Sequence, residues 1–168
     1  MIDIESALRA LAAGGVEFIV VGGVAARAHG SARLTNDLDV VYRRTPENIE
    51  RLVGALAPHG PYLRGAPPGL PFRWDRETIL RGLNFTLTTA LGDLDVLGEI
   101  TGGGGYEALI AHSAPVAAFG LRIACLDLES LIRVKRAAGR PRDLEAVAEL
   151  EALFEERQRG GGAEERKS

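Results

Sequence analysis

Two periods of apolar and polar positions alternate along this chain, and each period predicts one kind of secondary structure. Continuous or every-second apolar positions predict strands at residues 17–21, 38–42, 72–74, 83–89, 93–97, 116–119 and 121–125. Apolar positions three and four residues apart predict helices at residues 4–13, 24–28, 46–56, 106–112, 128–138 and from 141 onward. Strands interspersed with helices favour an α/β (or α+β) fold, in which helices flank a small mixed sheet.

The 168 residues are 46% hydrophobic and 26% charged, which is typical of one globular domain. We place this domain at residues 1–158 and expect a disordered tail at residues 159–168, because the end of the chain is polar and rich in glycine. Five prolines and three glycines at residues 58–71 predict a surface loop.

Charge, cysteine content and hydropathy exclude several classes of protein. The net charge of −3 argues against a non-specific nucleic-acid binder. The single cysteine, Cys125, excludes a disulfide framework within the chain. No apolar run reaches the ~20 residues of a membrane span, and no basic segment followed by an apolar stretch opens the sequence. We therefore expect a cytoplasmic protein with no membrane partner.

Asp37 and Asp39 begin a predicted strand and carry the first candidate chemistry. Residues i and i+2 of a strand point to the same face, so the two carboxylates project together while Leu38 and Val40 face the core. Carboxylates this close repel each other unless a cation lies between them, and Mg²⁺ takes such oxygen ligands. Alone, the motif is also compatible with a capping residue followed by a solvated one.

A third carboxylate is offered by the later segment GDLDVLGE, through Asp93 or Asp95. We favour Asp95, because it lies deeper in the strand, whereas Asp93 adjoins the turn. Gly22 and Gly23 end the strand before the two acids and allow a close approach of the backbone to a ligand. Glycine pairs after strands are frequent, so only their combination with the acids makes the pattern specific.

In this order the segments resemble the polymerase-β-type minimal nucleotidyltransferases. The resemblance is carried by Gly22, Gly23, Ala25, His29, Gly30, Arg33, Thr35, Asp37 and Asp39, then by GDLDVLGE and by SLIRVKRAAGRPRDLEAVAEL. It implies that Asp37, Asp39 and Asp95 are the catalytic residues and bind Mg²⁺ or Mn²⁺. It also implies that a nucleoside triphosphate, such as ATP, contacts Gly22, Gly23, Ser31, Arg33, Thr35 and Lys135.

The sequence departs from the family at two positions. Many members have Gly-Ser where this chain has Gly22-Gly23, and a second acid of the last helix is replaced here by Ala146. We therefore expect Asp143 to be a helix-start and packing residue. His29 is expected to cap the small helix or to pack beneath the loop, in preference to catalysis. Phe72 and Trp74 are expected to pack in the core, in preference to stacking on a base or an acceptor.

The resemblance implies transfer of a nucleoside monophosphate to an acceptor hydroxyl with release of pyrophosphate. The acceptor stays open: a tRNA end, a protein or a small molecule, as in the toxin–antitoxin and drug-modifying relatives of this family. A homodimer or an antitoxin partner is expected to complete the site. The alternative is a non-catalytic nucleotide-binding or interaction module of the same fold, for example one component of a toxin–antitoxin pair.

Overall fold

The computed structural model describes residues 1–167, with side chains described for residues 1–160. A seven-stranded mixed sheet has the order β3-β4-β5-β2-β1-β9-β8. Its strands are β1 Phe18–Val21, β2 Asp37–Tyr42, β3 Tyr62–Leu63, β4 Asn84–Thr89, β5 Gly92–Leu97, β8 Ser113–Ala118 and β9 Leu121–Leu126. A two-stranded sheet pairs β6 Glu99–Ile100 with β7 Gly104–Gly105.

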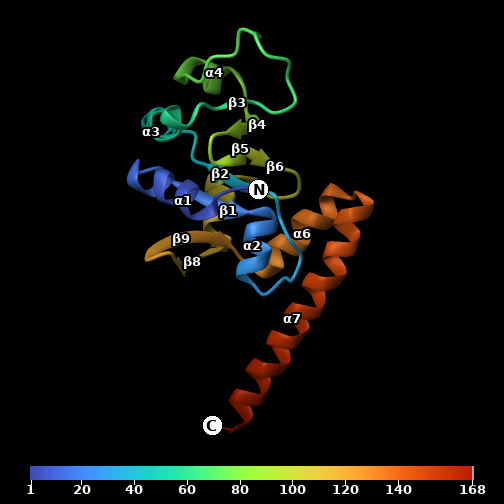
Figure 1. Ribbon diagram of the computed structural model, residues 1–168. Coiled ribbons are helices and arrows are strands. Elements are labelled where there is room, and N and C mark those ends of the chain that lie inside the picture. Colours follow the sequence, from blue (N-terminus) through green and yellow to red (C-terminus); the bar gives the residue numbers. More distant parts are fainter. Residues whose placement is uncertain (168) are drawn as a thin grey trace.

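Helices cover both faces of the seven-stranded sheet, with α1 and α3 on one face and α2, α6 and α7 on the other (Figure 1). The helices are α1 Ile4–Ala13, α2 Gly22–Ala28, α3 Pro46–Leu56, α4 Arg76–Arg81, α5 Tyr106–Leu109, α6 Leu128–Ala138 and α7 Pro141–Lys167, with 3₁₀ turns at Ala57–His59 and Ile110–His112. This mixed sheet between two helical layers confirms the expected fold class.

Side-chain caps mark the starts of three helices. Asp3 accepts a hydrogen bond from the Ser6 amide, Thr45 from the Asn48 amide, and Asp127 from the Ser130 amide. Pro46 stands at the start of α3, where its missing N–H costs nothing. Local sequence therefore determines where these three helices begin.

One predicted strand is absent from the described structure. Residues 72–74 are not a strand; Trp74 packs edge-on against Phe85 and donates a hydrogen bond to the Val53 carbonyl. The six-residue helix α4 follows, capped by Asp75, and is too short to give a periodic signal. α7 continues helically through the predicted tail as far as Lys167, and residue 168 lies outside the described part of the chain. The division of the chain at residue 158 stays a prediction.

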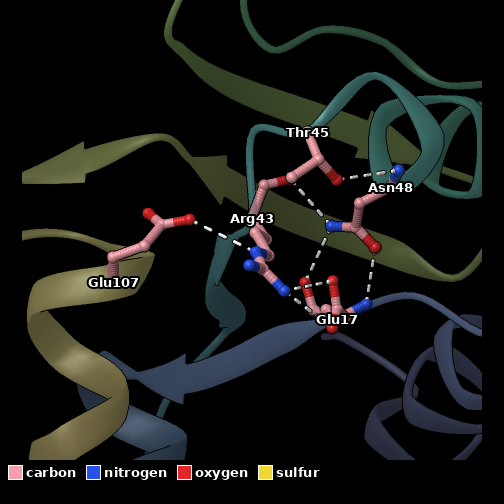
Figure 2. A network of polar contacts seen from close by, with 5 residues as sticks. All are labelled: Glu17, Arg43, Thr45, Asn48 and Glu107. Atoms are coloured by element: carbon pink, nitrogen blue, oxygen red, sulfur yellow. Dashed lines mark hydrogen bonds and ion pairs between the residues drawn. The ribbon is translucent and has the colours of Figure 1, made fainter.

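A polar network around the buried Asn48 joins the start of β1 to the end of β2 and to α3 (Figure 2). Asn48 is fully buried; its Oδ1 accepts from the Glu17 amide at 2.7 Å, and its Nδ2 donates to the carbonyls of Glu17 and Arg43 at 3.0 and 2.8 Å. The Arg43 side chain lies 3.2 Å from a Glu17 carboxylate oxygen and 3.3 Å from one of Glu107. This network holds the β1–β2 pair and α3 in register.

Candidate active site

Three carboxylates meet where β2 and β5 run side by side. The two strands are parallel, and their register sets Asp37 opposite Asp93 and Asp39 opposite Asp95. Leu38, Val40, Leu94 and Val96 point into the core, so the aspartates share the opposite face. Asp37, Asp39 and Asp95 each offer an oxygen within 4.8 Å of the others. The pairing of these strands, which the sequence could only suggest, therefore brings the predicted acids together.

Asp93 lies outside this cluster. Its side chain is 41% exposed, and its Oδ2 lies 3.3 Å from Nε of Arg64, whereas the Asp95 side chain is 15% exposed. Of the two aspartates that the sequence offered as a third ligand, the structure places Asp95 beside Asp37 and Asp39.

Burial and neighbouring charge perturb two of the acids. Burial, together with the charges of Asp37 and Asp95, raises the pKa of Asp39 to about 8. Burial also raises the pKa of Asp95, against the opposing effect of Arg64. Asp39 Oδ1 is buried without a hydrogen-bond partner among the described residues. A divalent cation would satisfy this oxygen and offset the repulsion, so the three carboxylates fit Mg²⁺ or Mn²⁺.

The glycine pair makes room for these acids. Gly22 has φ +66°, and a Cβ there would lie 2.1 Å from Asp39 Oδ2. A Cβ on Gly23 would lie 2.8 Å from the Thr35 hydroxyl oxygen. The sequence suggested that the glycines admit a ligand; the structure shows that they also admit the Asp39 and Thr35 side chains.

A cavity of about 380 Å³ opens beside the acid cluster. Eight of the predicted site residues line it: Gly23, Ser31, Arg33, Thr35, Asp37, Asp39, Asp95 and Lys135. Gly22 lines an adjoining cavity of about 270 Å³, which Asp39 and Lys135 also line. The structure therefore gathers all nine predicted residues around two cavities that share Asp39.

Several predicted nucleotide contacts already have partners on the protein. Glu149 of α7 accepts hydrogen bonds from the Ser31 hydroxyl and the Ala32 amide, at 2.5 and 3.2 Å. Arg33 lies 3.9 Å from a carboxylate oxygen of Glu145. The Thr35 hydroxyl donates to the Asp37 carbonyl at 3.0 Å. The carboxylates of α7 thus occupy donors that the resemblance assigns to phosphate.

Lys135 is held in a second cluster, around Asp143. Its Nζ lies 3.4 Å from Asp143 Oδ1, and Arg140 Nε lies 2.6 Å from Asp143 Oδ2. Burial opposes ionisation of Asp143, but the Arg140 hydrogen bond and the Lys135 charge hold its pKa below its usual value. Its bond to the Arg140 amide at the start of α7 agrees with the helix-start role expected from the sequence.

His29 serves packing and not the acid cluster. Its Nε2 lies 2.8 Å from the Leu126 carbonyl oxygen and its Nδ1 3.0 Å from Arg157 Nη1. These distances fit a ring that donates from Nε2 and accepts at Nδ1, joining α2 to β9 and α7.

Sequence reasoning missed Arg64 and Glu149. Arg64 Nη2 lies 2.6 Å from Asp95 Oδ1, and Glu149 holds the loop at Ser31. Each contact joins segments far apart in the chain, and neither residue belongs to a motif. Arg64 reaches its partner only once β3 pairs with β4, and Glu149 reaches its partner only once α7 packs against the rest of the chain.

Comparison with known proteins supports the fold. No known family model matches the sequence, and no curated protein matches it. The antibiotic-resistance factor ANT(2'')-Ia is similar in structure, with TM-score 0.54, 15% identity, and 98% of this chain and 96% of that chain covered. A Thermotoga maritima protein (TM1012) assigned as a nucleotidyltransferase is similar at TM-score 0.55 and 16% identity, over 89% of this chain and 94% of that chain. The chain therefore has the fold of the polymerase-β-type nucleotidyltransferases.

Proposed function

We propose that the protein is a divalent-metal-dependent nucleotidyltransferase. It transfers the nucleoside monophosphate of an NTP to an acceptor hydroxyl: the acceptor oxygen bonds to the α-phosphorus, and the bond from that phosphorus to the departing pyrophosphate breaks. The observation that carries the proposal is the cluster of Asp37, Asp39 and Asp95, in which one buried carboxylate oxygen lacks a partner within the described chain. The fold, which it shares with nucleotidyltransferases, agrees with this chemistry.

The three acids have distinct roles in this proposal. Asp37 and Asp39 hold Mg²⁺ or Mn²⁺ with the triphosphate, and Asp95 completes the site and takes the proton of the acceptor hydroxyl. A bound divalent cation would stabilise the charge on the phosphoryl group and on the attacking and leaving oxygens. Burial of Asp39 keeps bulk water from screening these interactions.

The triphosphate binds to the donors that line the two cavities. Gly22, Gly23, Ser31, Arg33, Thr35 and Lys135 are the proposed contacts. Support comes from the groups that these residues contact in the structure: Glu149 at Ser31, Glu145 at Arg33 and Asp143 at Lys135. Carboxylate oxygens resemble phosphate oxygens as acceptors, so these donors are already arranged for oxyanions. Phosphate oxygens would displace the α7 carboxylates from these donors, or would share the donors with them.

The acceptor belongs to one of three classes: a tRNA end, a protein hydroxyl or a small molecule. The structural similarity to an antibiotic-resistance factor makes small hydroxyl compounds a class to test first. NTP is the nucleotide substrate, with ATP as the first to try, and the cytoplasm is the compartment that this substrate implies. A second copy of the chain or an antitoxin partner would supply the missing wall of the open site. No helix in the described residues is both long and apolar enough to cross a bilayer.

One transfer experiment tests the function. The protein is incubated with each α-labelled NTP, Mg²⁺, and either bulk tRNA, a cell extract or a panel of small hydroxyl compounds. The Asp37→Asn/Asp39→Asn double variant should lose label transfer and pyrophosphate release. Glu77→Gln is the control, because it removes an exposed carboxylate on α4 that pairs with Arg81 outside the cavities.

Transfer that survives in the double variant would contradict the proposed site. If the wild type binds NTP but neither transfers label nor releases pyrophosphate, the non-catalytic nucleotide-binding module becomes the better description. The presence of all three acids favours the enzyme, because a module that only binds nucleotide does not require a cluster of three mutually repelling carboxylates.

A further inference from the structure

Arg64 contacts Asp95 of the acid cluster but is not one of the three proposed metal ligands. It follows β3, and its amide donates to the Thr86 carbonyl of β4 at 3.0 Å. Its side chain crosses β4 and reaches β5, where Nη2 lies 2.6 Å from Asp95 Oδ1. The same Nη2 lies 2.8 Å from the Leu87 carbonyl oxygen, and Nε lies 3.3 Å from Asp93 Oδ2. Both ends of this residue are therefore anchored to the sheet.

The three contacts make specific use of a guanidinium group. Its planar fork presents several donors in fixed directions, so Nη2 donates to the Asp95 carboxylate and the Leu87 carbonyl together, while Nε lies at ion-pair distance from Asp93 without a hydrogen bond within the described chain. An ammonium group is a single point charge and cannot span the Asp93 and Asp95 carboxylates in the same way. The Arg64 side chain is 30% exposed and that of Asp95 15%, so water competes weakly for this contact.

Asp95 is constrained from two sides. Arg64 binds its Oδ1, while an oxygen of Asp95 lies within 4.8 Å of an oxygen of Asp39. An aspartate beside two other acids would otherwise rotate away from them, because like charges repel. The bond from Arg64 to Asp95 Oδ1 opposes such a rotation.

We propose that Arg64 is a positioning residue that holds the Asp95 carboxylate with one oxygen directed at Asp39, and so preorganises the third ligand of the metal site. This inference rests on the proposed function of the three acids as metal ligands. Positioning of Asp95 by Arg64 would strengthen metal binding. The positive charge of Arg64 alone would weaken metal binding, because it repels a cation. Replacing Arg64 therefore distinguishes the two roles by the direction of the change.

The test measures Mn²⁺ affinity by electron paramagnetic resonance on the full chain, without nucleotide or acceptor. Arg64→Met removes the fork and its charge, and Arg64→Lys keeps the charge but removes the fork. If Arg64 positions Asp95, both variants bind Mn²⁺ about 10-fold more weakly, which is the usual effect of losing a residue that orients a metal ligand. Arg76→Met is the control, because Arg76 pairs with Glu50 on the surface.

Rescue separates positioning from a general loss of structure. Millimolar methylguanidinium should restore the Mn²⁺ affinity of Arg64→Ala and should leave the Mn²⁺ affinity of Asp95→Asn unchanged. Thermal unfolding in EDTA shows whether the variants are folded. Unchanged or tighter Mn²⁺ binding by both Arg64→Met and Arg64→Lys would overturn the positioning role and leave the metal site intact. A wild-type chain that binds no Mn²⁺ would overturn the metal site as well.

Discussion

At the scale of single residues, the surroundings of Asp39 disfavour its charged form when no cation is bound. Its carboxylate is buried, lies beside two other acids and has one oxygen without a partner in the described structure. A structural role alone would favour an uncharged residue at this position. The cost of keeping an acid there supports the proposed role of Asp39 in binding a cation.

Asp39 makes the stability of the metal-free protein depend on pH. Its pKa is about 8 in the native state against 3.8 ordinarily, so between about pH 4 and pH 8 the native protein holds a proton that the unfolded chain has lost. The free energy of unfolding should fall as pH rises across this window, by up to ~1.4 kcal/mol per pH unit. Urea unfolding in EDTA at several pH values measures this slope.

The neutral variant Asp39→Asn should flatten the slope and raise stability at pH 8, while transfer activity is lost. Glu77→Gln should leave the slope unchanged. Mg²⁺ favours the ionised carboxylate, so it should reduce the slope in the wild type alone. An Asp39→Asn variant with the wild-type slope would show that another group titrates.

Gly22 is the second residue-scale test. Gly22→Ala puts a Cβ 2.1 Å from Asp39 Oδ2, in a backbone conformation of φ +66° that itself costs ~1–2 kcal/mol for an L-residue. We expect a loss of at least about 2 kcal/mol in the free energy of unfolding and loss of Mn²⁺ binding. Gly54→Ala in α3 is the matched control, because no atom lies within 4 Å of its added Cβ.

The control should gain ~0.5–1 kcal/mol, since alanine is the better helix former. Denaturant unfolding measures both changes. If Gly22→Ala is as stable as the wild type and binds Mn²⁺ equally well, the close packing of α2 against Asp39 is not required.

At the scale of elements, the β1–β2–α3 unit depends on one amide. Asn48→Ala removes the partner of the Glu17 amide and of the Arg43 carbonyl, while the Glu17 carbonyl keeps its bond from the Arg43 amide at 3.2 Å. Unpaired buried groups cost ~1–3 kcal/mol each, and partial relaxation reduces the sum, so we expect a loss on the order of 3 kcal/mol. Thermal and urea unfolding measure it.

Thr45→Ala provides the comparison, because it removes one cap contact of the same network and should cost about 1 kcal/mol. Equal effects of Thr45→Ala and Asn48→Ala would mean that water replaces the Asn48 contacts.

Elements with a strong local signal were predicted well. The apolar alternation of β4 and β5, the unbroken β1 and the capped starts of α1, α3 and α6 all lie where the pattern indicated. Elements that depend on tertiary contact were not: Trp74 packs on Phe85 in place of a strand, and α4 is held by its Asp75 cap and the burial of Ile79. Short elements of this kind have too few positions to establish a period.

The acid cluster was predicted because its acids lie in strands with a strong local signal. Period-2 spacing fixed Asp37 and Asp39 on one face, and the same alternation around Asp95 indicated a matching strand. That β2 and β5 pair in register is a long-range fact that no local pattern encodes. The partners of the predicted phosphate contacts, Glu145 and Glu149, come from the docking of α7 and escaped prediction for the same reason.

At the scale of the whole molecule, residues 1–158 are predicted to form the complete domain. The last part of α7 extends away from the sheet, and side chains from Glu155 to Gly160 are exposed (Figure 1). A chain that ends at residue 158 retains Arg157, which bonds to His29. Its unfolding temperature, measured by calorimetry, should equal that of the full chain. Its Mn²⁺ affinity, measured by electron paramagnetic resonance, should also equal that of the full chain. A lower unfolding temperature would extend the domain beyond residue 158.

The parallel pairing of β2 with β5 also has a consequence for how the chain folds. Hairpins such as β4–β5 and β8–β9 close short loops and can form early. The pairing of β2 with β5 closes a longer loop that contains α3, β3 and α4, so it forms later. Asp39 and Asp95 become neighbours only when this late contact forms. The coordination site is thus absent from partly folded chains, and a bound ion would slow unfolding without speeding the early steps of folding.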